Sequence, residues 1–168
     1  DGGIVEQTYN TFKHIEAEHY YNTTTYLSTT YFIQPLNIQT FYYELDGPSQ
    51  KSTHTFKGIE RIFSDYDEYG NVGTIQEKYS DYSETKSTLK FQKITTHDYS
   101  ENVEFSALGR LTKATTTVTS LDTPSDPDIN EVQFEYFPVE TIWKAMLKTE
   151  KTITTDGSKN VTKTYEYD

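Results

Sequence analysis

The stretch that decides the fold class is VTKTYEY, residues 161–167. Val161, Tyr165 and Tyr167 occupy odd positions, whereas threonine and glutamate fill the even positions after them. Because successive side chains of a β-strand point to opposite faces of a sheet, this order predicts a strand with one packed face and one solvated face. Residues 132–136 alternate in the same way.

Similar segments recur along the whole chain, separated by turn residues. Together they predict about ten strands, which cover Ile4 to Phe12, Thr23 to Phe32, Gln39 to Leu45, Thr53 to Phe63, Val72 to Tyr79, 89–92, Leu111 to Thr119, 132–136, Lys148 to Thr155 and 161–167. This spacing is typical of a meander, a barrel, a sandwich or a hairpin solenoid. The exception is residues 138–147. Apolar residues there also follow a helical spacing behind Pro138, which leaves a short helix and a turn as alternatives.

Composition agrees with a folded β-protein. The 168 residues include 15 tyrosines and 9 phenylalanines, and threonine is abundant. Disordered chains are poor in aromatic and β-branched residues, whereas these residues suit the pleated surface of a sheet. Cysteine is absent, which excludes disulfides, thiolate zinc sites and cysteine nucleophiles. The sequence therefore predicts an all-β chain that is stabilised by packing alone.

The charge balance argues against one class of partner. Fifteen basic and 26 acidic side chains give a formal net charge of −11 at pH 7, and the basic residues are scattered. Such a chain repels a phosphate backbone, so nucleic acid is not an expected partner. No window approaches the roughly 18 consecutive apolar residues of a membrane span. The opening residues DGGI also lack the basic and apolar regions of a signal peptide, so we expect neither feature in this sequence.

Four turn motifs separate the predicted strands, at Asp46–Gly47, residues 67–70, residues 106–109 and Asp156–Gly157. In an Asp-x-x-Gly turn the carboxylate accepts hydrogen bonds from backbone N–H groups, and the glycine supplies the positive φ that closes the hairpin. We therefore predict a turn that is held by the carboxylate at 67, with positive φ at the glycines at 70 and 109.

Two of these motifs resemble a known repeat. Residues 65–72, DYDEYGNV, are similar to the tyrosine-aspartate motif of the Rhs/YD-repeat family, in which Tyr-Asp is followed two residues later by Gly-Asn or Gly-Arg. Residues 105–113, FSALGRLTK, resemble that family's Leu-Gly-Arg-Leu-Thr element, and residues 164–168, TYEYD, resemble the first half of another repeat. The turn residues that the resemblance marks as structural are Asp67, Gly70, Asn71, Gly109, Arg110, Gly157 and Asp168.

The order of motifs is most similar to the Rhs-like region of Tc insecticidal toxin B components and SpvB-like secreted toxins. This resemblance implies an open strip of antiparallel β-hairpins over residues 1–168, with degenerate units at about 28–70, 71–119 and 131–168. It implies a structural segment of a secreted or bacterial cell-surface protein, in which the repeats form a shell around a C-terminal effector. The implied partners are neighbouring repeats, the enclosed effector and other toxin subunits. The final strand is then expected to lie at an exposed edge.

The sequence departs from that pattern at three places. Ser106 stands where an acid is common, Tyr69 fills a position that is often small, and residues 135–137, EYF, lack the Tyr-Asp pair.

No motif for catalysis or metal binding outweighs a structural interpretation. The four histidines are His14, His19, His54 and His97, and no Gly-x-Ser-x-Gly elbow accompanies them. A strand would place His14, Glu16 and Glu18 on one face as metal ligands, but such faces are usually just solvated. The acidic loop with Asp122, Asp126 and Asp128 fits no EF-hand spacing. We therefore expect no enzyme activity and no cofactor.

A carbohydrate-binding or adhesive β-module remains as the alternative function. Tyrosine and tryptophan present rigid amphipathic surface to a ligand, and the stacking candidates are Trp143, Tyr42 and Tyr43. Cross-strand packing is the structural interpretation of the same residues.

Overall fold

The structure is a computed structural model. It describes residues 4–21, 26–45, 51–67, 69–83, 86–100, 109–122, 124, 126–138, 146–155, 157 and 160–167. Its nine strands are β1 (Ile4–Tyr21), β2 (Tyr26–Leu45), β3 (Lys51–Ser64), β4 (Thr74–Ser83), β5 (Lys86–Tyr99), β6 (Leu111–Ser120), β7 (Asp128–Tyr136), β8 (Leu147–Thr154) and β9 (Val161–Thr164).

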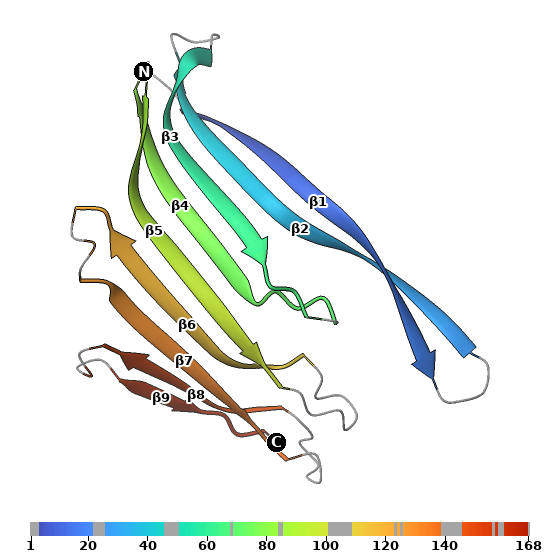
Figure 1. Ribbon diagram of the computed structural model, residues 1–168. Helices are drawn as coiled ribbons and strands as arrows, with labels where there is room; N and C mark the ends of the chain where they lie inside the picture. Colours follow the sequence, from blue (N-terminus) through green and yellow to red (C-terminus); the bar gives the residue numbers. More distant parts are fainter. Residues whose placement is uncertain are drawn as a thin grey trace.

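The strands form one open sheet in which each strand pairs with the next along the chain (Figure 1). All eight pairings are antiparallel. The prediction of an all-β array of antiparallel strands is confirmed, and β9 lies at the edge of the described sheet. The segment 139–145, where helix and turn were the alternatives, falls outside the described residues, and β8 begins at Leu147. The part of the chain that the structure describes contains no helix long and apolar enough to cross a membrane.

Several predicted boundaries are wrong. β1 continues to Tyr21 rather than ending at Phe12, and β5 covers Lys86–Tyr99 rather than 89–92. The segments at 23–32 and 39–45 were expected to be separate strands, but both belong to the single strand β2, which continues through Pro35. Opposite it, Thr11 pairs with Asn37 and Phe12 pairs with Pro35, so Leu36 is the extra residue of a β-bulge. A bulge interrupts the ladder of backbone hydrogen bonds, and it therefore tolerates a proline that has no N–H to donate.

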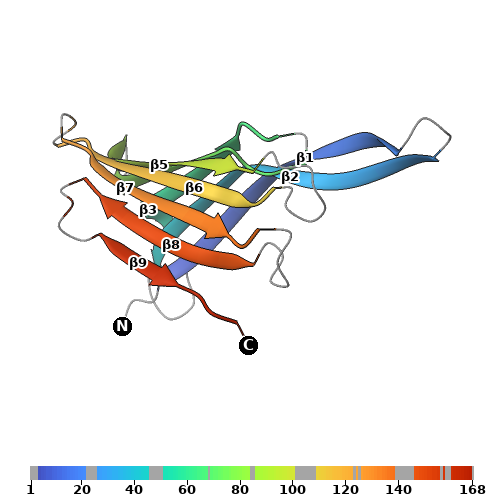
Figure 2. The same ribbon diagram turned by 90° about the horizontal axis from the view of Figure 1, so that it is seen from below.

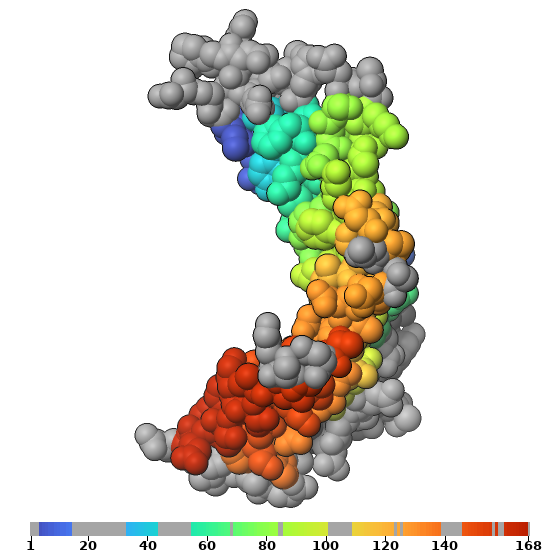
Figure 3. All heavy atoms as spheres, turned by 90° about the vertical axis from the view of Figure 1, so that its left-hand side faces the viewer, coloured from blue at the N-terminus to red at the C-terminus, as the bar shows by residue number. Residues whose placement is uncertain are grey.

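The sheet is strongly curved. Seen from below, β1 and β9 both bend towards the same side (Figure 2). The space-filling view shows a C-shaped outline with an open hollow (Figure 3). The paired strands β1 and β2 also extend beyond β3, because β3 pairs with β2 only from Asn37 onward. The described chain is thus a trough with a two-stranded arm (Figure 1).

The curved sheet is a single layer. No described side chain is fully buried, and all ten residues of β6 are half-buried, whichever face they lie on. The accessible surface is 11851 Å², whereas a compact monomer of this mass exposes about 8,500 Å². The expected division into a packed and a solvated face is therefore wrong for β9, where even Val161 is 51% exposed. Alternation predicts a packed face only where a second layer covers it.

Candidate functional site

The turn between β3 and β4 is held by the carboxylate of Asp67. Its Oδ1 accepts the backbone N–H groups of Tyr69 at 2.9 Å and Asn71 at 2.8 Å, and its Oδ2 accepts the side-chain amide of Asn71 at 2.8 Å. The backbone closes the same turn, because Asp67 donates to the carbonyl of Asn71 and Gly70 donates to the carbonyl of Asp67. Gly70 has φ of 84°. The predicted use of the carboxylate and of a positive φ at Gly70 is confirmed.

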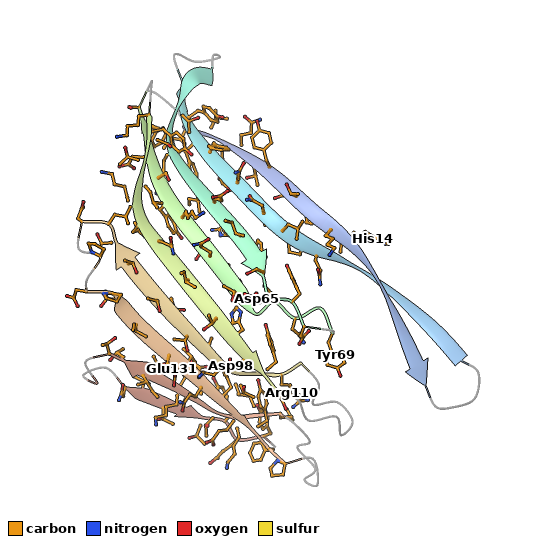
Figure 4. The ribbon with its side chains drawn as sticks, in the orientation of Figure 1. His14, Asp65, Tyr69, Asp98, Arg110 and Glu131 are labelled. Carbon is orange, nitrogen blue, oxygen red and sulfur yellow. The ribbon has the colours of Figure 1, made fainter. Side chains whose placement is uncertain are left out.

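The two motifs that carry the family resemblance touch each other. A Cβ on Gly109 would lie 2.7 Å from Nδ2 of Asn71, and Gly109 has φ of 72°. Arg110 follows Gly109 at the start of β6, beside the turn that carries Tyr69 (Figure 4). Asn71 therefore links two successive hairpins, since its backbone belongs to one turn and its side chain packs against the next.

A second link joins this turn to β5. The carbonyl oxygen of Val72 accepts the Tyr99 hydroxyl at 3.0 Å and lies 3.1 Å from Nδ1 of His97. The backbone N–H of His97 donates to the carbonyl of Gly73 at 2.7 Å. Two side chains and one backbone group of β5 thus hold the end of the turn at 72–73.

The Tyr99 contact belongs to a series of four. A tyrosine lies at or just after the C-terminal end of each of β3, β5, β7 and β9, and its hydroxyl donates to a backbone carbonyl on the side of the preceding strand. The four bonds run from Tyr66 to Pro35 at 2.5 Å, from Tyr99 to Val72 at 3.0 Å, from Tyr136 to Leu111 at 2.8 Å and from Tyr167 to Leu147 at 2.8 Å. We call these the tyrosine clamps. They recur at intervals of roughly 30 to 40 residues, a spacing typical of repeat architectures.

Three of the clamps are joined by strand pairing into one continuous path. Tyr99 is paired with Leu111 across β5 and β6, and Leu111 accepts the hydroxyl of Tyr136. Tyr136 is in turn paired with Leu147 across β7 and β8, and Leu147 accepts the hydroxyl of Tyr167. Each step contains the same parts: a tyrosine, the leucine that starts the next strand, and the tyrosine of the strand after that.

Three of these phenols have a raised pKa. Burial raises the pKa of Tyr66, Tyr99 and Tyr136 above its ordinary value. At Tyr99 the negative charge of Asp67 adds to the rise, and at Tyr136 the positive charge of Arg110 opposes it. The Arg110 guanidinium lies 5.2 Å from the centroid of the Tyr136 ring. A tyrosine is protonated at neutral pH in any case, and the raised pKa extends to more alkaline pH the range in which these hydroxyls donate to a carbonyl.

A small hollow lies elsewhere, on one face of β2, β3 and β4. It has a volume of about 100 Å³ and is lined mainly by Gln39, Phe41, Gly58, Glu60, Lys78 and Tyr82. The Phe41 and Tyr82 rings meet edge to face, with centroids 6.0 Å apart. The Glu60 carboxylate accepts the side-chain amides of Asn37 at 2.9 Å and Gln39 at 3.0 Å, and these bonds lower its pKa. The polar groups that line the hollow are thus largely hydrogen-bonded to one another or to neighbouring side chains.

A cross-strand ion cluster lies on the central strands. The Glu77 carboxylate of β4 contacts Arg61 of β3 and Lys93 of β5, each at 2.7 Å. Glu77 is only 8% exposed. Burial alone would raise its pKa, but the hydrogen bonds from Lys93 and Arg61 outweigh burial and hold the pKa below its ordinary value. The cluster joins three strands through one carboxylate that lies between two cations.

The structure separates most of the other sequence candidates. His14 is exposed on the β1–β2 arm (Figure 4), and the side chains of Glu16 and Glu18 lie outside the described residues. Asp122, Asp126 and Asp128 are exposed, and the described residues contain no group of three potential metal ligands. Tyr42 and Tyr43 are half-buried in β2, and the Tyr42 ring centroid lies 6.0 Å from Nζ of Lys57.

Gly157 has φ of 66° in the turn between β8 and β9, whereas Trp143, His19, His54, Ser106 and Asp168 are outside the part of the chain whose side chains are described. The sequence interpretation missed Tyr99 and His97, which anchor the turn at 72–73. A signal was present, because a tyrosine lies at the end of β5 and β7 and within three residues after the end of β3 and β9. These are Tyr99, Tyr136, Tyr66 and Tyr167.

Comparison with known proteins identifies no relative. The chain matches no protein family, no curated protein and no solved structure.

Proposed function

We propose that this chain is a structural segment of a YD-repeat shell, in a secreted bacterial toxin or a related surface protein that encloses or presents a C-terminal effector. The observation that carries the proposal is the series of tyrosine clamps, which recurs at β3, β5, β7 and β9. A bond repeated at equivalent places is the mark of an array in which each unit contacts mainly its neighbours.

The shape of the sheet supports an enclosing role. A single layer leaves both faces half-exposed, and the accessible surface exceeds that of a compact monomer. Large hydrophobic side chains such as Phe91, Ile129 and Val161 are exposed on the sheet, and covering them by another body would stabilise the chain. The curvature provides a hollow that such a body can occupy (Figure 3).

The contacts of the motif residues support the family assignment within this proposal. Asp67, Asn71 and Gly109 are the residues on which the resemblance to the Rhs/YD repeat rests, and they form the link between two successive hairpins. A motif whose residues hold adjacent units together is expected in a repeat whose function is architectural.

Imaging of the native protein that contains this chain would test the proposal. We expect the sheet to continue past β9 and to wrap around a separate globular domain, which stays resistant to protease until the sheet is unfolded. A sheet that is closed by an unrelated domain, or a neighbouring domain that is cleaved as fast as it is when isolated, would overturn the proposal.

The hollow on β2, β3 and β4 favours a second candidate, a carbohydrate-binding or adhesive module. Aromatic rings beside amide, carboxylate and ammonium groups suit a polyhydroxylated ring. Calorimetric titration with methyl glycosides of common host sugars distinguishes the two functions. A structural segment should give no saturable heat. Saturable binding that is lost in Tyr82→Ala and retained in Tyr69→Ala, which changes an exposed tyrosine outside the hollow, would favour the module.

A further inference from the structure

The strands that end in a tyrosine clamp are equivalent in direction and in neighbours. Because every pairing is antiparallel and sequential, β3, β5, β7 and β9 all run the same way through the sheet. Each of β3, β5 and β7 pairs on its far side with the next strand, which runs in the opposite direction. The structure describes no strand on the far side of β9. The far side of β9 is therefore equivalent to the side on which β3 pairs with β4, β5 pairs with β6 and β7 pairs with β8.

Pairing follows one register at two of these three positions, β5 with β6 and β7 with β8. The residue after Tyr99, Ser100, donates its N–H to the carbonyl of Arg110, which precedes Leu111. The residue after Tyr136, Phe137, donates in the same way to the carbonyl of Met146, which precedes Leu147. In both cases the tyrosine is therefore opposite the leucine that begins the next strand.

The far side of β9 carries donors that match this register. The N–H of Tyr165 donates to Lys148 of β8, so it points inward. Because N–H groups alternate along an antiparallel strand, those of Lys163 and Val161 also point towards β8, whereas those of Thr164 and Thr162 point outward. All four residues of β9 are exposed.

We propose that the outer edge of β9 binds an antiparallel strand that begins with an aliphatic residue opposite Tyr167, followed by a strand whose terminal tyrosine donates to the carbonyl of that residue. The occupant is thus a further two-strand unit of the same construction as β6 with β7. This inference rests on the proposed repeat function and names the partner and the register of its edge.

Threonine is the expected main component of the incoming strand. Hydroxyl pairs join neighbouring strands at Thr8 with Thr40, 3.3 Å apart, and at Thr95 with Thr116, 3.1 Å apart. The strand β6, LTKATTTVTS, starts with leucine and supplies such a partner to β5.

The outer edge of β1 in a second copy does not fit this position. The strands β1 and β9 run in the same direction, so stacking copies edge to edge by translation would pair them in parallel. Every pairing within the chain is antiparallel. Two copies can also join their β9 edges about a two-fold axis, which gives an antiparallel pair. The strand beyond the incoming β9 would then be β8, which ends at Thr154 and supplies no terminal tyrosine for the clamp.

The experiment extends the chain with its own unit. Residues 100–136 are repeated directly after Tyr167, because Tyr167 is the equivalent of Tyr99. Hydrogen exchange is then compared at Thr162, Thr164 and Lys163. In the parent chain we expect the two threonines to exchange at least tenfold faster than Lys163, and in the extended chain we expect this difference to disappear. A matched extension with the same residues in shuffled order is the control, and it should leave the difference in place.

A disulfide tests the register independently of exchange. The equivalence of Lys163 with Thr95 places Lys163 opposite the copy of Thr116. The chain has no cysteine, so one introduced pair is unambiguous. Lys163→Cys should cross-link with Thr116→Cys in the repeated unit, and at least tenfold more slowly with Val118→Cys, which is displaced by two residues.

Two results would overturn the proposal. One is an unchanged difference in exchange together with equal rates of the two cross-links. The other is a parent chain whose Thr162 and Thr164 are already as protected as Lys163 in a dimer that dissociates on dilution, which would assign the edge to a second copy. If the added unit does not protect Thr162 and Thr164 but the native sheet is seen to continue past β9, only the proposed register is disproved. The proposed function fails only if the native sheet does not continue, so the two failures are distinguishable.

Discussion

The side-chain amide of Asn71 packs against Gly109, so that a Cβ on Gly109 would come within 2.7 Å of Nδ2. Asn71 belongs to the turn after β3, and Gly109 lies just before β6. The same Asn71 amide donates to Oδ2 of Asp67 at 2.8 Å. The Asn71 side chain therefore holds its own turn closed and also sets the distance between this turn and the next hairpin.

Replacement of Gly109 by alanine should destabilise the chain more than the same change at Gly157. Both glycines have positive φ, of 72° and 66°, but a Cβ on Gly157 meets nothing within 4 Å. Gly157→Ala should therefore cost about 1 kcal/mol for backbone strain alone. Gly109→Ala adds displacement of Asn71 and should cost about 2 to 3 kcal/mol. Urea unfolding of both variants measures the difference, and equal losses would show that the contact with Asn71 contributes nothing.

Removal of the Asp67 carboxylate should loosen the turn after β3. Asp67→Ala leaves the N–H groups of Tyr69 and Asn71 without their acceptor, so we expect a loss of about 1 to 2 kcal/mol in unfolding free energy. Asp122→Ala is the matched control, because Asp122 is exposed in a connecting loop. The position of the loss can be followed by hydrogen exchange at Gly70 and Gly73. A variant that melts with the parent chain would mean that the backbone bonds alone hold the turn.

The tyrosine clamps should be measurable one hydroxyl at a time. Tyr136→Phe removes the bond to the Leu111 carbonyl and keeps the ring beside Arg110, so it should cost about 1 kcal/mol. Tyr82→Phe serves as the control, because Tyr82 lies in the hollow on β2–β4 and belongs to no clamp. Denaturant unfolding of both variants gives the comparison. Equal stability of the two variants would show that the Tyr136 clamp does not contribute to the joining of neighbouring units.

Much of this architecture was predictable from local sequence. Alternation identified nearly every strand, and Asp67 with Gly70 identified the turn chemistry, because both signals act over a few residues. The joining of two predicted strands through Pro35 was not predictable in this way. The bulge that accommodates the proline depends on the partner strand, where Thr11 and Phe12 pair on either side of Leu36.

The degree of burial was harder to predict for a different reason. Alternation at residues 161–167 predicts a packed face, but Val161 is half-exposed because the described sheet has no second layer over it. The tyrosine clamps were not predicted as a set because the prediction rested on Tyr-Asp pairs. Tyr99 is followed by serine and Tyr136 by phenylalanine, although the bond needs only the tyrosine hydroxyl. In this chain the position of the tyrosine at the strand end is better retained than the motif around it.

The ion cluster around Glu77 should make the unfolding free energy of the sheet depend on pH. Because the hydrogen bonds from Lys93 and Arg61 hold the pKa of Glu77 below its ordinary value, folding favours the ionised carboxyl. The contribution is fully present above the pKa of the unfolded chain, about 4.3, and it is lost as the pH falls through the lower pKa of the folded chain. The difference in unfolding free energy between the parent and Glu77→Gln should therefore be largest near neutral pH and should shrink below about pH 4.

At neutral pH this difference should be about 1 to 3 kcal/mol, since the amide that replaces the carboxylate would leave two cations beside a neutral group in a largely buried position. Asp81→Asn is the matched control. Asp81 is paired with Lys90 at 3.6 Å, and both side chains are about half-exposed or more, so water screens the pair and its removal should change stability by less than about 0.5 kcal/mol. Chemical unfolding of the three proteins at several pH values between about 3 and 7 supplies the curves. A Glu77→Gln curve that runs parallel to that of the parent would show that the carboxyl is not preferentially ionised in the folded sheet, and that the two short contacts across β3, β4 and β5 do not stabilise it.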